Sequence, residues 1–220
     1  MRMKRNWNAE EKLRFEKEML ALGARYIAGA DEVGRGPLAG PVVCAAVIMP
    51  LADGEIIEGI DDSKKLSEKE RGRLFELIKK QAVAYRIEEL SNEEIDRLNI
   101  LEATRLCMKR AVDGLAIEPD VVFTDGNFSI DISLPQQNII KGDALSYTIG
   151  AASILAKVHR DRLMCEYDKI YPQYGFAAHK GYGTAAHEAA IREYGLCEIH
   201  RRTFTKKFWA GQGKSGAQNF

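Results

Sequence analysis

Two adjacent carboxylates, Asp31 and Glu32, end an apolar stretch that begins at Tyr26 and stand just before the turn Gly34-Arg35-Gly36. A second apolar run, Val42 to Met49, follows that turn. Neighbouring carboxylates between two core strands repel each other and lose hydration unless a cation offsets both effects. The pair therefore predicts a divalent metal, and the glycine turn predicts a substrate whose backbone comes very close. This combination is typical of metal-dependent phosphodiesterases.

Two more acids stand at the ends of predicted elements. Asp125 ends a short buried strand, and Asp143 follows another strand at the start of a helix. Taken singly, Asp143 would be a helix cap and Asp125 a turn residue. Ligands collect at strand ends in open α/β sheets, so all four acids together favour convergence on Mg²⁺ or Mn²⁺, which prefer oxygen ligands. Two such ions about 3.5–4 Å apart would activate a water and stabilise the leaving oxygen.

Apolar periodicity predicts the elements that carry these acids. Helices are expected over 9–22, 67–81, from 91, over 100–115 and 143–171, and after 184; strands are expected over 26–33, 42–49, 83–90, 121–124 and 138–141. Ser67 with Glu70 and Ser91 with Glu94 have the spacing of capping boxes. Alternating strands and helices predict an α/β domain with a mixed sheet and helices on it.

Composition narrows the class of protein. The 220 residues, 45% of them apolar, fit one large domain or a domain with a small appendage. No apolar run approaches the roughly 18 residues that span a bilayer, and the basic N-terminus leads into a charged helix instead of a signal core. The four cysteines form no C-x-x-C pair, and Cys44 lies in an apolar strand. We expect a buried thiol and a cytoplasmic protein.

Positive charge gathers toward the C-terminus. Residues 141–220 hold 12 lysines and arginines against 7 acids, and no acid follows Glu198. Charge alone leaves two interpretations open, a solvated basic tail or a surface for a phosphate-rich partner.

The glycines of residues 34–40 only superficially match a dinucleotide-binding fingerprint. The third glycine comes one residue late, and an apolar strand follows where that fingerprint requires a helix. Two interpretations remain, a plain tight turn or a loop whose amides approach a ribose or phosphate without Cβ interference.

Six blocks of the sequence, in order, resemble bacterial ribonuclease HII. They are residues 31–42 (DEVGRGPLAGPV), 62–67 (DSKKLS), 124–127 (TDGN), 141–144 (KGDA), 153–161 (SILAKVHRD) and 179–184 (HKGYGT). The resemblance extends from about residue 26 to about residue 205. It implies a ribonuclease H-like fold with a five-stranded mixed sheet and a helical C-terminal extension. It also implies endonucleolytic cleavage of the RNA strand in RNA–DNA hybrids, including 5′ of a single ribonucleotide embedded in duplex DNA.

The same resemblance implies roles for individual residues. Asp31, Glu32, Asp125 and Asp143 become the catalytic, metal-binding carboxylates, with Mn²⁺ or Mg²⁺ as cofactor. Gly34, Arg35 and Gly36 become the loop that senses the 2′-hydroxyl. Tyr182 becomes the aromatic residue that packs on the sugar after the ribonucleotide. Further substrate contacts are predicted for Ser63, Lys64, Lys157 and Arg160, with solvated surface charge as the less favoured alternative for the three cations. No histidine has metal-binding spacing, and none is assigned a role.

The expected organisation is an N-terminal helical extension (1–25), a catalytic domain (26–197) and a basic C-terminal segment (198–220) with a disordered tail from Gly211. The expected partners are RNA–DNA hybrids and DNA containing ribonucleotides. The protein is expected to be a monomer that does not bind a membrane. A sliding-clamp contact has weak support, because Gln218-Asn219-Phe220 lacks the apolar residues of clamp-binding peptides.

Two alternatives are the sister enzyme ribonuclease HIII and a non-catalytic nucleic-acid-binding protein with a structural metal. Ribonuclease HIII carries an extra N-terminal domain, whereas only about 25 residues precede the first predicted strand here. The Gly-Arg-Gly loop and Tyr182 also favour ribonuclease HII. A passive binder gains nothing from carboxylates beside phosphates.

Overall fold

The computed structural model describes residues 7–208, apart from the side chain of Lys207. Its sheet has the order β3-β2-β1-β4-β5. The strands are β1 (Ile27–Val33), β2 (Val42–Ile48), β3 (Ala84–Leu90), β4 (Val121–Asp125) and β5 (Gln136–Ile139). β1, β4 and β5 are parallel, whereas β2 runs antiparallel to both β1 and β3. The predicted five-stranded mixed sheet is confirmed, with strand ends within about two residues of those expected.

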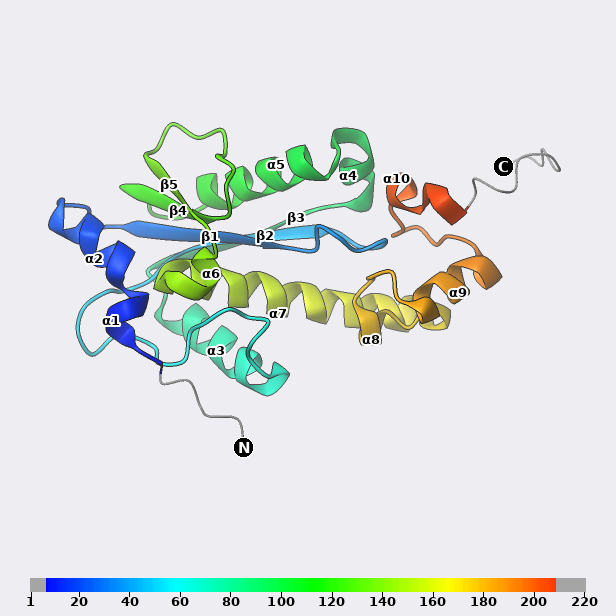
Figure 1. Cartoon of the computed structure of the whole chain (residues 1–220), viewed down its shortest axis with the longest axis horizontal. Helices are drawn as coiled ribbons and strands as arrows, with labels where there is room; N and C mark the ends of the chain where they lie inside the picture. The colour runs from blue at the N-terminus through cyan, green and yellow to red at the C-terminus, as the bar shows by residue number, and fades with distance from the viewer. Residues whose placement is uncertain (1–6, 209–220) are drawn as a thin grey trace.

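β2 shows why its sequence is a continuous apolar run. Val43 and Val47 pack into a core with α3 (Glu68–Gln81) and α7 (Tyr147–Ile170), whereas Cys44 and Ala46 pack into a core with α5 (Ile100–Asp113). Both faces of this strand are therefore buried. Figure 1 shows the sheet nearly edge-on, with α7 and α3 on one side and α5 with α4 (Asn92–Leu98) on the other. Cys44 is 0% exposed, which confirms the predicted buried thiol.

The remaining helices are short. They are α1 (Ala9–Lys12), α2 (Arg14–Ala21), α6 (Gly142–Leu145), α8 (Phe176–His179), α9 (Ala185–Tyr194) and α10 (Arg202–Thr205), with 3₁₀ turns at η1 (Pro172–Tyr174) and η2 (Lys206–Phe208). α8 and α9 lie at the far end of α7, opposite α1 and α2 (Figure 1). This arrangement confirms a helical C-terminal part.

Two predicted helices are interrupted. The helix expected over 9–22 divides at Leu13, and the one expected over 143–171 divides at Ser146. The Ser146 hydroxyl accepts a hydrogen bond from Ile149 N and donates one to buried Glu16 of α2, so a separate helix begins there. The capping box of Ser91 and Glu94 is confirmed. Ser67 also caps its helix, but the Glu70 side chain binds Arg73 instead of the cap.

β1 and α7 approach each other closely at Gly29. A Cβ at Gly29 would lie 2.1 Å from the carbonyl carbon of Thr148, so only glycine fits there. Small residues of α7 lie next to this contact in the sequence, and Ala151 and Ala152 are both 0% exposed. This contact fixes the start of α7 beside the strand that carries the first two acids.

The C-terminal residues 211–220, for which disorder and a weak clamp motif were predicted, lie outside the described residues. Within residues 7–208, no helix is both long and apolar enough to cross a membrane.

Candidate active site

Parallel pairing of β1 with β4 brings two predicted acids together. Ala30 pairs with Thr124, so Asp31 and Asp125 occupy the next position on neighbouring strands. Asp31 is 6% exposed. Burial, and then the charges of Glu32 and Asp125, raise the pKa of Asp31 well above its usual range. The strand ends therefore place like charges within strong electrostatic reach of one another.

Asp143 joins this group from α6. The residue Lys141 adopts a left-handed conformation (φ 60°) before α6, and Gly142 N donates to Asp125 Oδ1 at 2.6 Å. Burial and the charge of Asp125 raise the pKa of Asp143. The structure thus brings together the four acids predicted to converge, here termed the carboxylate cluster (Asp31, Glu32, Asp125 and Asp143).

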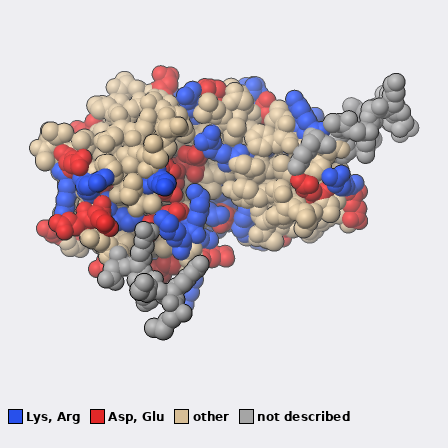
Figure 2. Space-filling view, in the orientation of Figure 1, with Lys and Arg blue, Asp and Glu red and all other residues tan. Residues whose placement is uncertain are grey.

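The carboxylate cluster has few cations close by. Lys64 Nζ lies 3.9 Å from Asp143 Oδ2, and Arg35 Nη1 lies 3.5 Å from Glu32 Oε1. Burial raises the pKa of Glu32 despite Arg35, and Glu32 Oε2 is buried without a hydrogen-bond partner. Figure 2 shows acidic and basic side chains close together in the middle of the face where α6 lies. The cluster is left with uncompensated negative charge.

The carboxylate cluster suits a divalent metal ion in the type of its donor atoms but not yet in their positions. Among residues 7–208, no three histidine, cysteine, aspartate or glutamate side chains are arranged to hold one ion. Asp125 Oδ1 accepts from Gly142 N, and Asp31 Oδ1 accepts from Glu32 N. The donors are nevertheless all carboxylate oxygens, which suit Mg²⁺ and Mn²⁺, and a cation would relieve their repulsion. The cluster fits a divalent ion in chemistry, and side-chain rotation must complete its coordination.

Two glycine-containing loops, residues 34–41 and 180–184, pack against each other beside the carboxylate cluster and are here termed the glycine loops. Leu38 N donates to Gly181 O at 2.8 Å. A Cβ at Gly36 would lie 3.7 Å from Tyr182 Cε1, so the tyrosine ring lies against this glycine. Tyr182 is 43% exposed. The structure therefore joins the two segments predicted to read the substrate.

The other predicted contacts divide by exposure. Lys64 is 78% exposed beside Asp143, whereas Lys157 donates to Asp161 Oδ1 at 2.7 Å. Ser63 is 3% exposed and its hydroxyl bonds to that of Ser153, which places it beneath the surface. Arg160 is 0% exposed. The Ser63 and Arg160 side chains expose almost no surface in this structure, and substrate contact through them stays a prediction.

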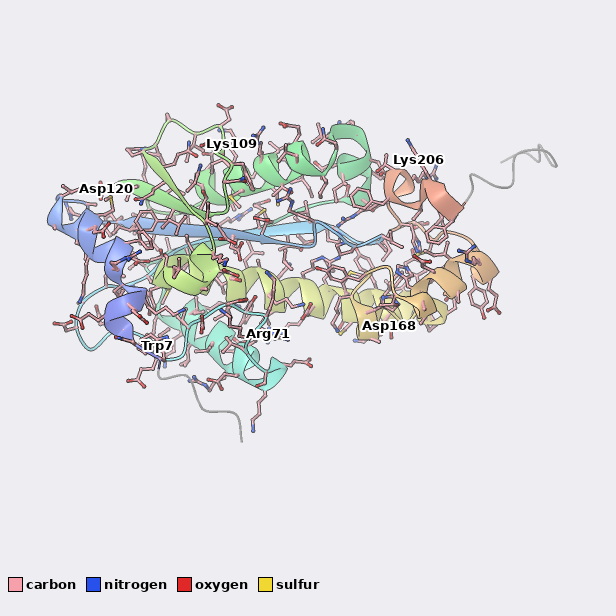
Figure 3. All side chains as sticks on the ribbon, in the orientation of Figure 1. Trp7, Arg71, Lys109, Asp120, Asp168 and Lys206 are labelled. Atoms are coloured by element: carbon pink, nitrogen blue, oxygen red, sulfur yellow. The ribbon has the colours of Figure 1, made fainter. Side chains whose placement is uncertain are left out.

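Sequence reasoning missed two arginines that hold loops in place, Arg71 and Arg201. Arg71 of α3 donates to the carbonyls of Ser63 and Leu66, and thereby anchors the loop that carries Lys64. Figure 3 labels Arg71 in the region between α3 and α7. Arg201, grouped with the basic C-terminal segment, is fully buried, so both interpretations of that segment are wrong at this position. Its place depends on the long-range bridge between Ala39 and His200, for which the sequence carries no local signal.

Comparison with known proteins agrees with this geometry. The family model described as Ribonuclease HII matches residues 28–211. A curated Ribonuclease HII from Ruminiclostridium cellulolyticum is 54% identical over 199 residues, which is 90% of this chain and 77% of the relative. Ribonuclease HII 1 from Methylibium petroleiphilum is 57% identical over 187 residues, covering 85% and 93% of the two chains.

Solved structures show the same fold. The ribonuclease H2 of Pyrococcus horikoshii has a TM-score of 0.72 at 27% identity, covering 84% of this chain and 97% of its own. The ribonuclease HII of Archaeoglobus fulgidus, solved in complex with PCNA, has a TM-score of 0.70 at 25% identity, covering 88% and 100%. A Bst-RNase HIII solved with Mn²⁺ has a TM-score of 0.60 at 20% identity over 84% and 69% of the two chains, which supports a shared fold alone.

Proposed function

The chain belongs to the ribonuclease HII family of metal-dependent ribonucleases H, and we propose that it cuts the RNA strand of RNA–DNA hybrids and also cuts 5′ of a single ribonucleotide in duplex DNA. The observation that carries this proposal is the meeting of the carboxylate cluster with the glycine loops. One part supplies oxygen ligands for metal-assisted hydrolysis, and the other supplies close backbone and an exposed aromatic ring for reading a sugar.

Asp31, Glu32, Asp125 and Asp143 are proposed to hold two divalent ions, Mn²⁺ or Mg²⁺. Such ions, when bound, activate a water and stabilise the departing 3′-oxygen, which leaves 5′-phosphate and 3′-hydroxyl ends. Lys64 lies 3.9 Å from Asp143 and stands 78% exposed, so it can contact a phosphate while it offsets the charge of that acid. Burial and mutual repulsion raise the pKa values of Asp31 and Asp143, so a bound cation would favour the ionised form of both acids.

The glycine loops are proposed to choose the cleavage site. Gly34, Arg35 and Gly36 place backbone amides within reach of a 2′-hydroxyl, the group that distinguishes RNA from DNA. Tyr182 lies against Gly36 and presents an exposed ring, which suits packing on the sugar of the next nucleotide. Lys157 remains a proposed phosphate contact, although its ion pair with Asp161 must then open.

The chain is proposed to act as a cytoplasmic monomer. The Archaeoglobus fulgidus relative was solved with PCNA. A similar clamp contact is a weakly supported proposal for this chain.

The test is cleavage of a DNA duplex that contains one ribonucleotide, with Mg²⁺, with Mn²⁺ and with chelator. We expect a metal-dependent cut immediately 5′ of the ribonucleotide. An intact duplex, together with a cut continuous hybrid, would restrict the activity to that of the sister family. No cleavage of either substrate under any metal would favour a binding protein.

A further inference from the structure

Two buried arginines lie beneath the glycine loops. Arg160 of α7 and Arg201, just before α10, are both 0% exposed. Both guanidinium groups donate to backbone carbonyls. The charges of Asp161 and Asp96 attract Arg160 and Arg201, respectively, but these attractions are smaller than the effect of burial. Burial lowers the pKa of Arg160 to about 10, and burial together with the charge of Arg160 lowers that of Arg201 to about 9. Burying two like charges is costly, so packing alone does not explain them.

Both guanidinium groups donate to carbonyls of the first glycine loop. Arg201 donates to Gly34 O, to Arg35 O at 2.9 Å and to Gly40 O at 2.9 Å. In a trans peptide the C=O and the next N–H point in opposite directions. Because the carbonyls of Gly34 and Arg35 turn toward Arg201, the N–H groups of Arg35 and Gly36 turn away from it. These are the amides proposed to meet the 2′-hydroxyl.

Arg160 joins the first glycine loop to the second. Its guanidinium donates to Ala39 O at 3.2 Å, to Pro41 O at 3.0 Å and to Lys180 O at 3.0 Å. A Cβ at Gly34 would lie 2.3 Å from Arg160 Nε, so the loop rests directly on this side chain. One buried cation therefore sets the spacing of both loops.

A pair of histidines holds Tyr182 from the other side. His187 Nδ1 lies 2.9 Å from Tyr182 O, so this nitrogen must carry the proton. Cys197 N donates to His200 Nδ1 at 2.9 Å, which leaves the proton of His200 on Nε2. The two Nε2 atoms are 3.1 Å apart, and this assignment gives one donor and one acceptor. Two neutral imidazoles thus connect the Tyr182 backbone to the segment that carries Arg201.

We propose that Arg160, Arg201 and His187 are positioning residues that hold the outward amides of residues 35 and 36 in register with the Tyr182 ring, and that preference for a ribonucleotide–DNA junction depends on them. The inference rests on the proposed function, because it assigns the determinants of its selectivity. A continuous hybrid offers many registers for cleavage, whereas a single ribonucleotide offers one, so loss of loop register affects the single site more.

The experiment measures kcat/KM on a single-ribonucleotide duplex and on a continuous hybrid for two matched pairs of variants. Arg201→Lys keeps the charge but loses the three-carbonyl fork, whereas Arg202→Lys changes the exposed neighbour. His187→Leu removes the donor to Tyr182 O, whereas His187→Asn keeps a donor near the Nδ1 position. We expect the junction-to-hybrid ratio to fall about tenfold in Arg201→Lys and His187→Leu and to stay within about twofold in the two controls.

Circular dichroism melting identifies the variants that fold. Equal losses on both substrates in folded Arg201→Lys and His187→Leu proteins would overturn the inference and leave these residues a structural role. If one variant does not fold, the other pair carries the same comparison, and Arg160→Lys serves if both fail. A wild-type enzyme that spares the single-ribonucleotide duplex would instead contradict the proposed function, so the two failures are distinguishable.

Discussion

The carboxylate cluster and the arginine–histidine group beneath the glycine loops are both buried and polar, but they satisfy their charges differently. Glu32 Oε2 lacks a hydrogen-bond partner, and repulsion helps to raise the pKa of Asp31. By contrast, Arg160 and Arg201 each donate to three carbonyls, and His187 and His200 bond to each other. Uncompensated charge suits a group that receives cations, whereas satisfied hydrogen bonds suit a group that holds a shape.

The largest expected effect follows from removing one metal-ligand charge. Asp125→Asn keeps the acceptor for Gly142 N, so the fold should persist, whereas cleavage should fall by about a thousandfold or more. Asp113→Asn, on the exposed surface of α5, is the matched control and should cleave normally. Near-normal kcat in folded Asp125→Asn would exclude the proposed metal site.

The next effect tests the rigidity of the first glycine loop. Gly34 has φ 91°, and a Cβ there would meet Arg160 Nε at 2.3 Å and Pro41 O at 2.8 Å. We expect Gly34→Ala to lower the free energy of unfolding by about 3 kcal/mol, from backbone strain and the clash together. Gly54→Ala is the control, because Gly54 has φ 86° with nothing within 4 Å of a Cβ and should lose only about 1 kcal/mol. Equal losses in urea titrations would show that the loop adjusts freely.

Acidification should affect the two regions in opposite directions. Burial and His187 lower the pKa of His200 to about 4, from 6.5, so the unfolded chain takes up a proton before the folded one does. The stability that this group contributes is complete above pH 6.5 and is lost as the pH falls toward 4, by about 2–3 kcal/mol. The raised pKa of Asp31 has the reverse sign, because the folded state then binds the proton more readily and acid relieves the repulsion.

Comparison of the wild type with the His200→Gln variant isolates the contribution of His200 to the pH dependence of stability. His200→Gln keeps a donor near Nε2 and does not titrate, whereas the carboxylate cluster is present in both proteins. The difference in unfolding free energy between wild type and this variant should narrow from pH 7 to pH 4. If the difference in unfolding free energy does not change with pH, His187 and His200 are not a neutral pair in the folded state.

The smallest expected effect is a gain in stability. Asp31→Asn removes a buried, repelled charge but keeps an acceptor for Glu32 N. We expect the metal-free variant to be more stable than wild type by about 1–2 kcal/mol, and to gain less from added Mn²⁺. A less stable metal-free variant in thermal melts would mean that the cluster is not under charge repulsion.

The sequence predicts the carboxylate cluster better than the arginine–histidine group beneath the glycine loops, for a physical reason. Asp31, Glu32 and Asp125 end strands whose apolar periodicity is local, and parallel pairing then brings them together. Arg201 and His187 offer no such pattern. Arg201 donates to a carbonyl more than 150 positions away, and His187 bonds to Tyr182 O and His200, which apolar periodicity does not connect. Arg160 belongs to a motif that the sequence did reveal, yet charge alone favoured a phosphate contact over a buried one.

Helix boundaries show the same limit. The break at Ser146 arises because Glu16, 130 residues earlier, accepts from its hydroxyl and from Thr148 N. Periodicity cannot register a cap supplied from another part of the chain. By contrast, the capping box of Ser91 and Glu94 is local, and the sequence predicts it correctly.

The carboxylate cluster is proposed to cleave the substrate, and the glycine loops are proposed to read the junction. This division is tested most directly by Tyr182→Ala, assayed in parallel on a single-ribonucleotide duplex and on a continuous RNA–DNA hybrid. Tyr182 is 43% exposed, so removal of its ring should leave the fold and the carboxylate cluster intact. We predict a clearly larger loss of kcat/KM on the single-ribonucleotide duplex. Equal losses on both substrates would contradict a separate region for reading the junction.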